Sequence, residues 1–242
     1  MMRQTPGVGD WISEVTMSRT RVAWFRAAVV IGAPAVLLLG FAIHPYIGNA
    51  TDDAEVAAAA AESTTQWGLA HVAIGVGYAL LALAYVALRS FLREAGEERW
   101  SAVGMPFAVL GSCLFIPLTG MEFALLAAAE TGGDVEAVQE ELMPWFIPLL
   151  AAGALCSAIG ALCFAAAVAR SSVLSRTITR IVIVGFVVMA LARFIPLGAA
   201  QIVIGLAAVV ALWPIGYRIW ANTDLDASGR ELRPTARAAT EA

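Results

Sequence analysis

The chain alternates long apolar stretches with short polar segments. A helix that crosses a bilayer needs about 20 consecutive, mainly apolar residues. Six stretches reach this length, so the pattern predicts an all-α bundle of six transmembrane helices. The predicted spans are residues 22–44, 67–89, 103–128, 144–169, 179–197 and 200–219.

The last two spans are separated only by the short break at residues 196–198, Pro-Leu-Gly. A single apolar helix of about 40 residues would be too long for one crossing, so we expect an antiparallel hairpin. Residues 22–220 then form the transmembrane domain. Residues 1–21 are expected to be a cytoplasmic segment, and the polar residues 221–242 a disordered cytoplasmic tail.

Composition agrees with a membrane protein, because 60% of the residues are hydrophobic and 14% are charged. Soluble domains are about 45–50% apolar and about 25% charged. All 15 basic residues are arginine, which excludes a lysine Schiff base and is typical of GC-rich bacterial genomes. The three cysteines, Cys113, Cys156 and Cys163, lie inside apolar stretches and are interpreted as packing residues. Translation starts at either Met1 or Met17.

The arginines determine the predicted orientation. They cluster before the first span, in the second and fourth loops and after the sixth span. In the first and third loops the only charged residues are Asp and Glu. The positive-inside rule therefore predicts that both termini are cytoplasmic, in a bacterial cell membrane. In the acidic first loop, residues 52–62 are expected to form a short surface helix. Only Arg193 falls on the outer side.

Polar residues inside the predicted spans gather in one layer near the outer surface. His44, His71, Glu122, Arg193 and Gln201 come from all spans except the fourth. Ionisable residues in a membrane are costly, and by default they face the bundle interior or a water-filled cavity. This layer is therefore predicted to be a pocket that binds a small molecule or lipid.

Helical spacing extends this pocket inward. Two sets of polar or aromatic residues each share one helix face. The first set is Thr64, Trp67, His71, Tyr78 and Tyr85, and the second is Ser112, Thr119 and Glu122. The predicted ligand-binding residues are Trp67, His71, Tyr78, Thr119, Glu122, Arg193 and Gln201.

Each of these residues also has a structural interpretation. His44 can cap a helix before Pro45, and Trp67, Trp145 and Tyr46 can be interface anchors or packing residues. The small residues Gly153, Ser157 and Ala161, four apart, predict a close helix contact. Glu122 and Arg193 are expected to pair, either directly as a structural ion pair or through a bound anionic ligand.

Three kinds of chemistry are compatible with His44, His71 and Glu122. The three residues can bind one divalent metal, such as zinc or iron. The two histidines can instead be axial ligands of a haem. Glu122 and a histidine can also act as acid and base on a lipid-soluble substrate. The chain has no Walker loop, dinucleotide fingerprint or GxSxG motif.

The His44-Pro45 pair and the Trp67–His71 motif W-x-x-A-H resemble a group of actinobacterial multi-pass membrane proteins. The resemblance covers mainly residues 36–90. It implies no activity and draws attention to the two histidines. The expected partners are the lipid bilayer and a small-molecule or lipid ligand, with no nucleic acid. The competing prediction is a membrane-embedded enzyme, or a haem or metal redox protein.

Overall fold

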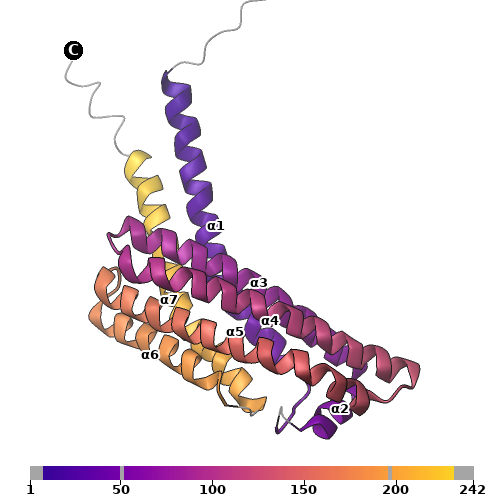
Figure 1. Cartoon of the computed structure of the whole chain (residues 1–242). Helices are drawn as coiled ribbons and strands as arrows, with labels where there is room; N and C mark the ends of the chain where they lie inside the picture. Colours follow the sequence, from indigo (N-terminus) through magenta and orange to yellow (C-terminus); the bar gives the residue numbers. More distant parts are fainter. Residues whose placement is uncertain (1–7, 50–51, 196–197, 232–242) are drawn as a thin grey trace, which may run out of the picture.

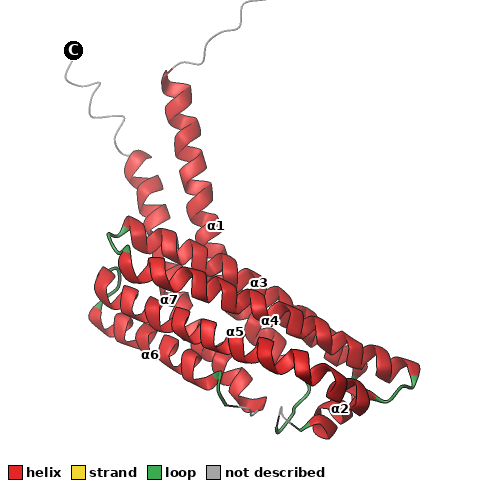
Figure 2. Cartoon of the chain, in the orientation of Figure 1, coloured by secondary structure: helices red, strands yellow, loops and turns green. Residues whose placement is uncertain are grey.

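The computed structural model describes residues 8–49, 52–195 and 198–231, with side chains from residue 20 to residue 222. These residues form helices and no strand (Figure 2). The helices are α1 (Val8–Ile43), α2 (Asp53–Glu62), α3 (Thr64–Glu94), α4 (Arg99–Thr131), α5 (Val135–Ser171), α6 (Arg176–Ala192) and α7 (Gly198–Glu231).

Five segments are long and apolar enough to cross a membrane. They are Thr20–Ile43, Thr64–Glu94, Arg99–Thr131, Val135–Ser171 and Gly198–Asn222. The predicted all-α membrane bundle is therefore confirmed, and the chain is a multi-pass membrane protein. The predicted fifth span corresponds to α6, which is apolar but has only 17 residues.

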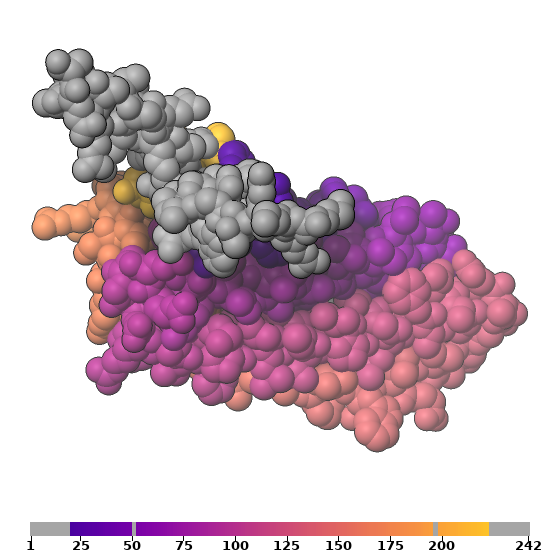
Figure 3. Space-filling model, turned by 90° about the horizontal axis from the view of Figure 1, so that it is seen from above, coloured from indigo at the N-terminus to yellow at the C-terminus, as the bar shows by residue number. Residues whose placement is uncertain are grey.

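The six long helices form a closed ring. Each packs mainly on two neighbours, in the order α1, α3, α4, α5, α6, α7 and back to α1. The short helix α2 lies across one end of this ring, against α3, α4 and α5 (Figure 1). We call this end the α2 end, and we call the opposite end, where α1 begins and α7 finishes, the terminal end. Viewed from above, α3 and α4 lie side by side along the molecule (Figure 3).

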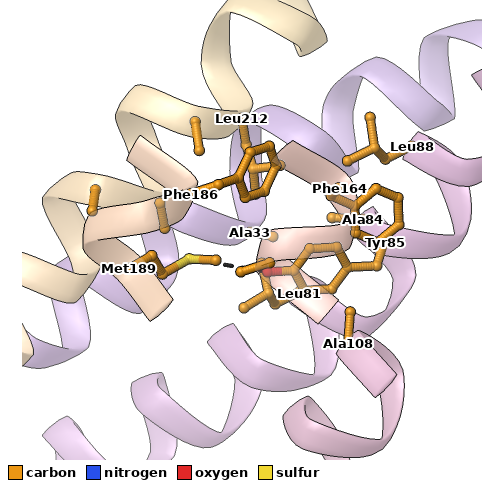
Figure 4. Close-up of a cluster of buried hydrophobic side chains, with 14 of the residues drawn as sticks. Ala33, Leu81, Ala84, Tyr85, Leu88, Ala108, Phe164, Phe186, Met189 and Leu212 are labelled. Carbon is orange, nitrogen blue, oxygen red and sulfur yellow. Dashed lines mark hydrogen bonds between the residues drawn. The ribbon is translucent and has the colours of Figure 1, made fainter. Parts of the chain in front are cut away.

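Large side chains fill the middle of the ring (Figure 4). Tyr85 stacks on Phe164 with ring centroids 5.2 Å apart, and Phe164 stacks on Phe186 at 6.4 Å. The Tyr85 hydroxyl points to the Met189 sulfur, 4.0 Å away. Since Leu81 and Leu212 complete this packing, the bundle is solid here. Any space for a ligand must therefore lie nearer one end.

Small residues let neighbouring helices approach closely. A Cβ atom added to Gly160 on α5 would lie 2.6 Å from the backbone nitrogen of Ala108 on α4. A Cβ added to Gly77 on α3 would lie 2.8 Å from the Cα of Leu37 on α1. The predicted contact through the small residues of α5 is confirmed, because Ser157 packs against the backbone position of Gly111. Such contacts replace the hydrophobic effect as the force between helices in lipid.

Several boundaries differ from the prediction. The acidic segment between the third and fourth spans is mostly helical, and only residues 132–134 form the turn. Asp134 caps α5 by accepting a hydrogen bond from the N–H of Ala137, which favours helix at once after the turn. The predicted disordered tail begins as helix, because α7 continues to Glu231; residues 232–242 lie outside the described part. The predicted surface helix is confirmed as α2, with Asp52 as its N-cap.

At the terminal end, Glu97 fixes the turn between α3 and α4. Its carboxylate accepts hydrogen bonds from the backbone N–H groups of Trp100, at 2.7 Å, and Ser101, at 3.0 Å. Partial burial opposes ionisation, but these hydrogen bonds, an interaction with the Ser101 side chain and the nearby charge of Arg89 together lower the pKa of Glu97. Arg99 and Arg170 lie over the Trp100 ring, at 5.6 and 5.2 Å.

Candidate functional site

A cavity of about 370 Å³ lies at the α2 end. All seven helices or the segments beside them contribute to its wall. Every residue predicted to form the outer polar layer or to bind the ligand lines it, although these residues are far apart in the sequence. They are His44, Trp67, His71, Tyr78, Thr119, Glu122, Arg193 and Gln201.

The predicted polar face of α3 supplies one side of this cavity. Trp67, His71 and Tyr78 line it and are almost fully buried, at 1%, 6% and 4% exposure. Their spacings of four and seven residues put them on one face of the helix. Tyr85, one further repeat along, lies in the solid core instead. The face therefore points inward along its whole length, and only its α2 end is open.

The predicted polar face of α4 also points inward, and it reaches the cavity only near the α2 end. Thr119 and Glu122, three residues apart, line the cavity. Ser112 is buried below them, and its hydroxyl donates a hydrogen bond to the carbonyl of Ala108 in its own helix, at 2.9 Å. Ser112 is thus satisfied within α4 and is not available to a ligand.

His44, His71 and Trp67 form a cluster of rings in contact. The His44 ring centroid lies 4.9 Å from that of His71 and 5.0 Å from that of Trp67. The Nδ1 atom of each histidine is within hydrogen-bond distance of a carbonyl, that of Pro45 for His44 (2.7 Å) and that of Trp67 for His71 (2.8 Å). Because a carbonyl can only accept, both Nδ1 atoms carry hydrogen, and each neutral ring keeps its lone pair on Nε2.

Trp67 connects this cluster to α4. Its indole N–H donates to the backbone carbonyl of Glu122, at 3.2 Å. Its 1% exposure shows that it is a packing residue and does not anchor the surface. Tyr46 and Trp145, at the same end, are 79% and 69% exposed, as interface aromatics are.

Arg193, just after α6, lies against an aromatic wall. Its Nη1 donates to the Tyr78 hydroxyl at 3.2 Å. Its guanidinium carbon is 4.7 Å from the ring centroid of Phe115 and 5.6 Å from that of Tyr78. The Tyr78 and Phe115 rings stack on each other at 4.6 Å. The negative faces of both rings stabilise the cation, and neither supplies a counter-charge.

The predicted direct ion pair between Glu122 and Arg193 is wrong. Within the described residues the only salt bridge joins Arg26 to Glu94, at 2.7 Å. Arg193 lies just after the end of α6, and its Nη1 donates a hydrogen bond to the Tyr78 hydroxyl instead. Two buried atoms that line the cavity are left without a hydrogen-bond partner, Oε2 of Glu122 and Nε of Arg193. Each such atom costs about 1–3 kcal/mol unless a partner is supplied.

The metal and haem hypotheses do not fit this geometry. No three His, Cys, Asp or Glu side chains in the described parts of the chain lie close enough together to hold one metal ion, so His44, His71 and Glu122 do not converge. A haem with two histidine ligands has its flat ring between them. The rings of His44 and His71 are in direct edge contact, which leaves no space for such a ring.

The sequence pattern missed the contribution of α5. Gln139 is 3% exposed and lines the cavity, together with Met143, Phe146 and Leu150. The sequence pattern places Gln139 and Met143 in a loop, and Phe146 and Leu150 in a span of no special polarity. Their spacings of four, three and four residues put them on one helix face, which could have identified them.

The fold and this cavity define a class: a multi-pass helical membrane protein with a partly polar cavity at one end of its bundle. Comparison with protein-family models, with curated proteins and with solved structures found no match to this chain. Its function must therefore be inferred from the cavity itself.

Proposed function

We propose that this membrane protein binds one small amphipathic molecule in the cavity at its α2 end. The observation that carries the proposal is the pair of buried, unpartnered atoms, Glu122 Oε2 and Arg193 Nε, on the wall of one cavity. Ligand sites are typically hollows of about 300–1,000 Å³ with mainly apolar walls and a few convergent polar groups. At about 370 Å³, this cavity is at the small end of that range.

The apolar part of the wall supports the same proposal. Phe41, Phe115 and Phe146 come from three different helices and line the same cavity as the polar groups. A molecule with an apolar body and a polar group matches both kinds of surface. The described polar side chains do not satisfy each other here, because Arg193 bonds to Tyr78 and the Oε2 atom of Glu122 has no partner.

Cavity filling tests this proposal. Ala200 is buried and lines the cavity, so Ala200→Trp should displace a bound molecule while leaving the helices in place. We expect protein purified from membranes to carry about one copy of a small molecule, detected by mass spectrometry of a solvent extract. Ala200→Trp should lose it, and Ala169→Trp, at an exposed position on α5, should retain it. Identical extracts from all three proteins, or extracts with no such molecule, would contradict the proposal.

Acid–base chemistry on the bound molecule is the second candidate. It is favoured by the contact between His44 and His71, because the Nε2 lone pair of either ring can accept a proton. The same extract distinguishes the two candidates. If the molecule is a substrate, its mass or its chromatographic retention time changes on incubation with the wild-type protein and stays constant with His71→Gln. If it is only a ligand, both properties stay constant with both proteins.

The proposal includes a six-span topology, with both termini in the cytoplasm of a bacterial cell. The 17 residues of α6 rise about 25 Å, close to the roughly 30 Å thickness of the bilayer core. α6 also packs between α5 and α7, which are both long enough to cross. The turns at the terminal end carry Arg99, Arg170 and Arg176, whereas α2 and the start of α5 carry acids. The positive-inside rule then puts the α2 end outside.

Cysteine labelling tests this topology. In a background where Cys113, Cys156 and Cys163 are replaced by alanine, Glu62→Cys and Glu140→Cys should react with an impermeant maleimide added to whole cells. Ala95→Cys and Ser175→Cys should react only after the membrane is opened. All four positions are at or near exposed helix ends, so burial does not bias the result. Opposite labelling of positions 95 and 175 would show that α4 or α5 does not span. Ala199→Cys, exposed at the start of α7, should react from outside, and its labelling on the same side as Ser175→Cys would show that α6 does not span.

A further inference from the structure

Among the described residues, the exposed part of the cavity wall lies in one place. Of its lining residues only four are exposed, and all four are apolar: Ile147 and Ala151 on α5, and Phe194 and Ile195 just after α6. Ile147, Phe194 and Ile195 are 43%, 57% and 49% exposed. All the other lining residues are buried or half-buried. The opening therefore lies between α5 and the end of α6, and we call it the side opening.

The short length of α6 explains why the side opening exists. α6 returns along α5 from the turn after Ser171, and its 17 residues rise about 25 Å. Ala151 and Ile147 are 171 − 151 = 20 and 171 − 147 = 24 residues before that turn, so they lie beyond the last turn of α6. Figure 1 shows α5 continuing toward α2 past the point where α6 ends.

The side opening faces lipid and not water. Its four residues carry no polar side-chain atom, and an opening that gives water access would be expected to be polar. Trp145, two residues before Ile147, is 69% exposed and is of the type that lies at the membrane interface. The side opening therefore lies near the boundary between head groups and acyl chains, where an amphiphile in the membrane has its polar group.

Arg193 determines which polar group fits. Its Nη1 is taken by Tyr78, its Nε is buried without a partner, and no described carboxylate is within 4.0 Å. An arginine in this position needs an anion, and the free edge of a guanidinium matches the two oxygens of a carboxylate or phosphate. Arg193 is next to Phe194 and Ile195 in the sequence. An oxyanion head group bound to Arg193 therefore places the acyl chain of the same molecule at the side opening.

We propose that the ligand is a single-chain amphiphile with an oxyanion head group, which comes sideways from the membrane through the side opening. This inference rests on the proposed binding function. The head group binds the Nε edge of Arg193, and this contact is sufficient for binding. Where the molecule also carries a hydrogen-bond donor, the Glu122 carboxyl group accepts it. The chain lies along Phe146 and Ile147. A volume of about 370 Å³ is suited to one chain and too small for a whole two-chain phospholipid.

Native mass spectrometry of the full chain, released from a neutral detergent, tests the head group. Dodecanoate, dodecanol, dodecylammonium and acetate are added separately. We expect dodecanoate to bind at least tenfold more tightly than the other three, and Arg193→Gln to lose this preference. Arg180→Gln, an exposed change at the opposite end of α6, should keep it.

Each of the other possible results contradicts one part of the proposal. If dodecanol binds as well as dodecanoate and Arg193→Gln changes nothing, the oxyanion is wrong while the binding cavity stands. If acetate binds as tightly as dodecanoate, the site takes a soluble anion and the amphiphile is wrong. If none of the four compounds binds the wild-type protein more tightly than it binds the Ala200→Trp variant, the proposed function itself is wrong.

The side opening has a separate readout. Ala151→Trp narrows it without touching Arg193, so it should slow dodecanoate association at least tenfold in a stopped-flow experiment in nanodiscs. Ala152→Trp, exposed on α5 but not lining the cavity, should leave the rate unchanged. Equal rates for all three proteins would show that the ligand does not pass between α5 and α6.

Discussion

Replacing Trp67 with alanine is expected to destabilise the protein by about 3–5 kcal/mol, the usual cost of removing a large buried aromatic side chain. Trp67 is 1% exposed, its ring contacts His44 and His71, and its N–H is bonded to the carbonyl of Glu122. The substitution therefore enlarges the cavity and also removes the ring that His44 and His71 pack against. Thermal unfolding in detergent, followed by circular dichroism, should show a strongly lowered midpoint.

Trp145→Ala is the matched control, because it removes the same side chain from the same end of the bundle. Trp145 is 69% exposed, so its loss should change the midpoint far less. Trp67→Phe should recover part of the stability by restoring the ring contacts without the hydrogen bond. Equal effects of Trp67→Ala and Trp145→Ala would mean that the ring cluster does not support the cavity wall.

A single methyl group at Gly160 should also have a large effect. In Gly160→Ala the new Cβ would lie 2.6 Å from the nitrogen and 2.7 Å from the Cα of Ala108, both backbone atoms that cannot turn aside. Helices α4 and α5 must move apart, which costs about 1–3 kcal/mol for overpacking of this kind. Gly160→Leu should prevent folding. The amount of monodisperse protein after gel filtration and its unfolding midpoint measure both effects.

Gly120→Ala introduces the same methyl group on α4 at a position where no atom lies within 4 Å. Since alanine is the better helix former, this variant should be as stable as the wild type or slightly more stable. If Gly120→Ala and Gly160→Ala unfold together, the close contact between α4 and α5 does not hold the bundle.

Much of the fold could be predicted from the sequence, because a bilayer restricts a chain to long apolar helices. Helical spacing also identified the inward faces of α3 and α4, and the layer of polar residues that now lines one cavity. The helix ends were harder. Beyond the bilayer core, apolarity no longer marks a helix, so the first turns of α5 and the last turns of α7 were predicted as loop or tail. Asp134 is an N-cap signal that could have identified the start of α5.

The partners of individual side chains could not be predicted. Matching charges at similar depth predict that Glu122 and Arg193 pair, either directly or through a bound anionic ligand, but depth says nothing of direction around the ring. Arg193 follows the end of α6 and reaches Tyr78 and Phe115 instead. Gln139 was missed because its helix was not expected. The first error concerns the rotation of helices around the ring, and the second concerns the residue at which a helix begins.

The most direct test of the central claim is an experimental structure of the wild-type protein in lipid nanodiscs. We expect extra density in the cavity that contacts the guanidinium of Arg193 and the carboxyl group of Glu122 and extends toward Ile147. A cavity that is closed, with the Glu122 carboxylate bonded directly to Arg193, would contradict the claim that these two groups are held apart to bind a ligand.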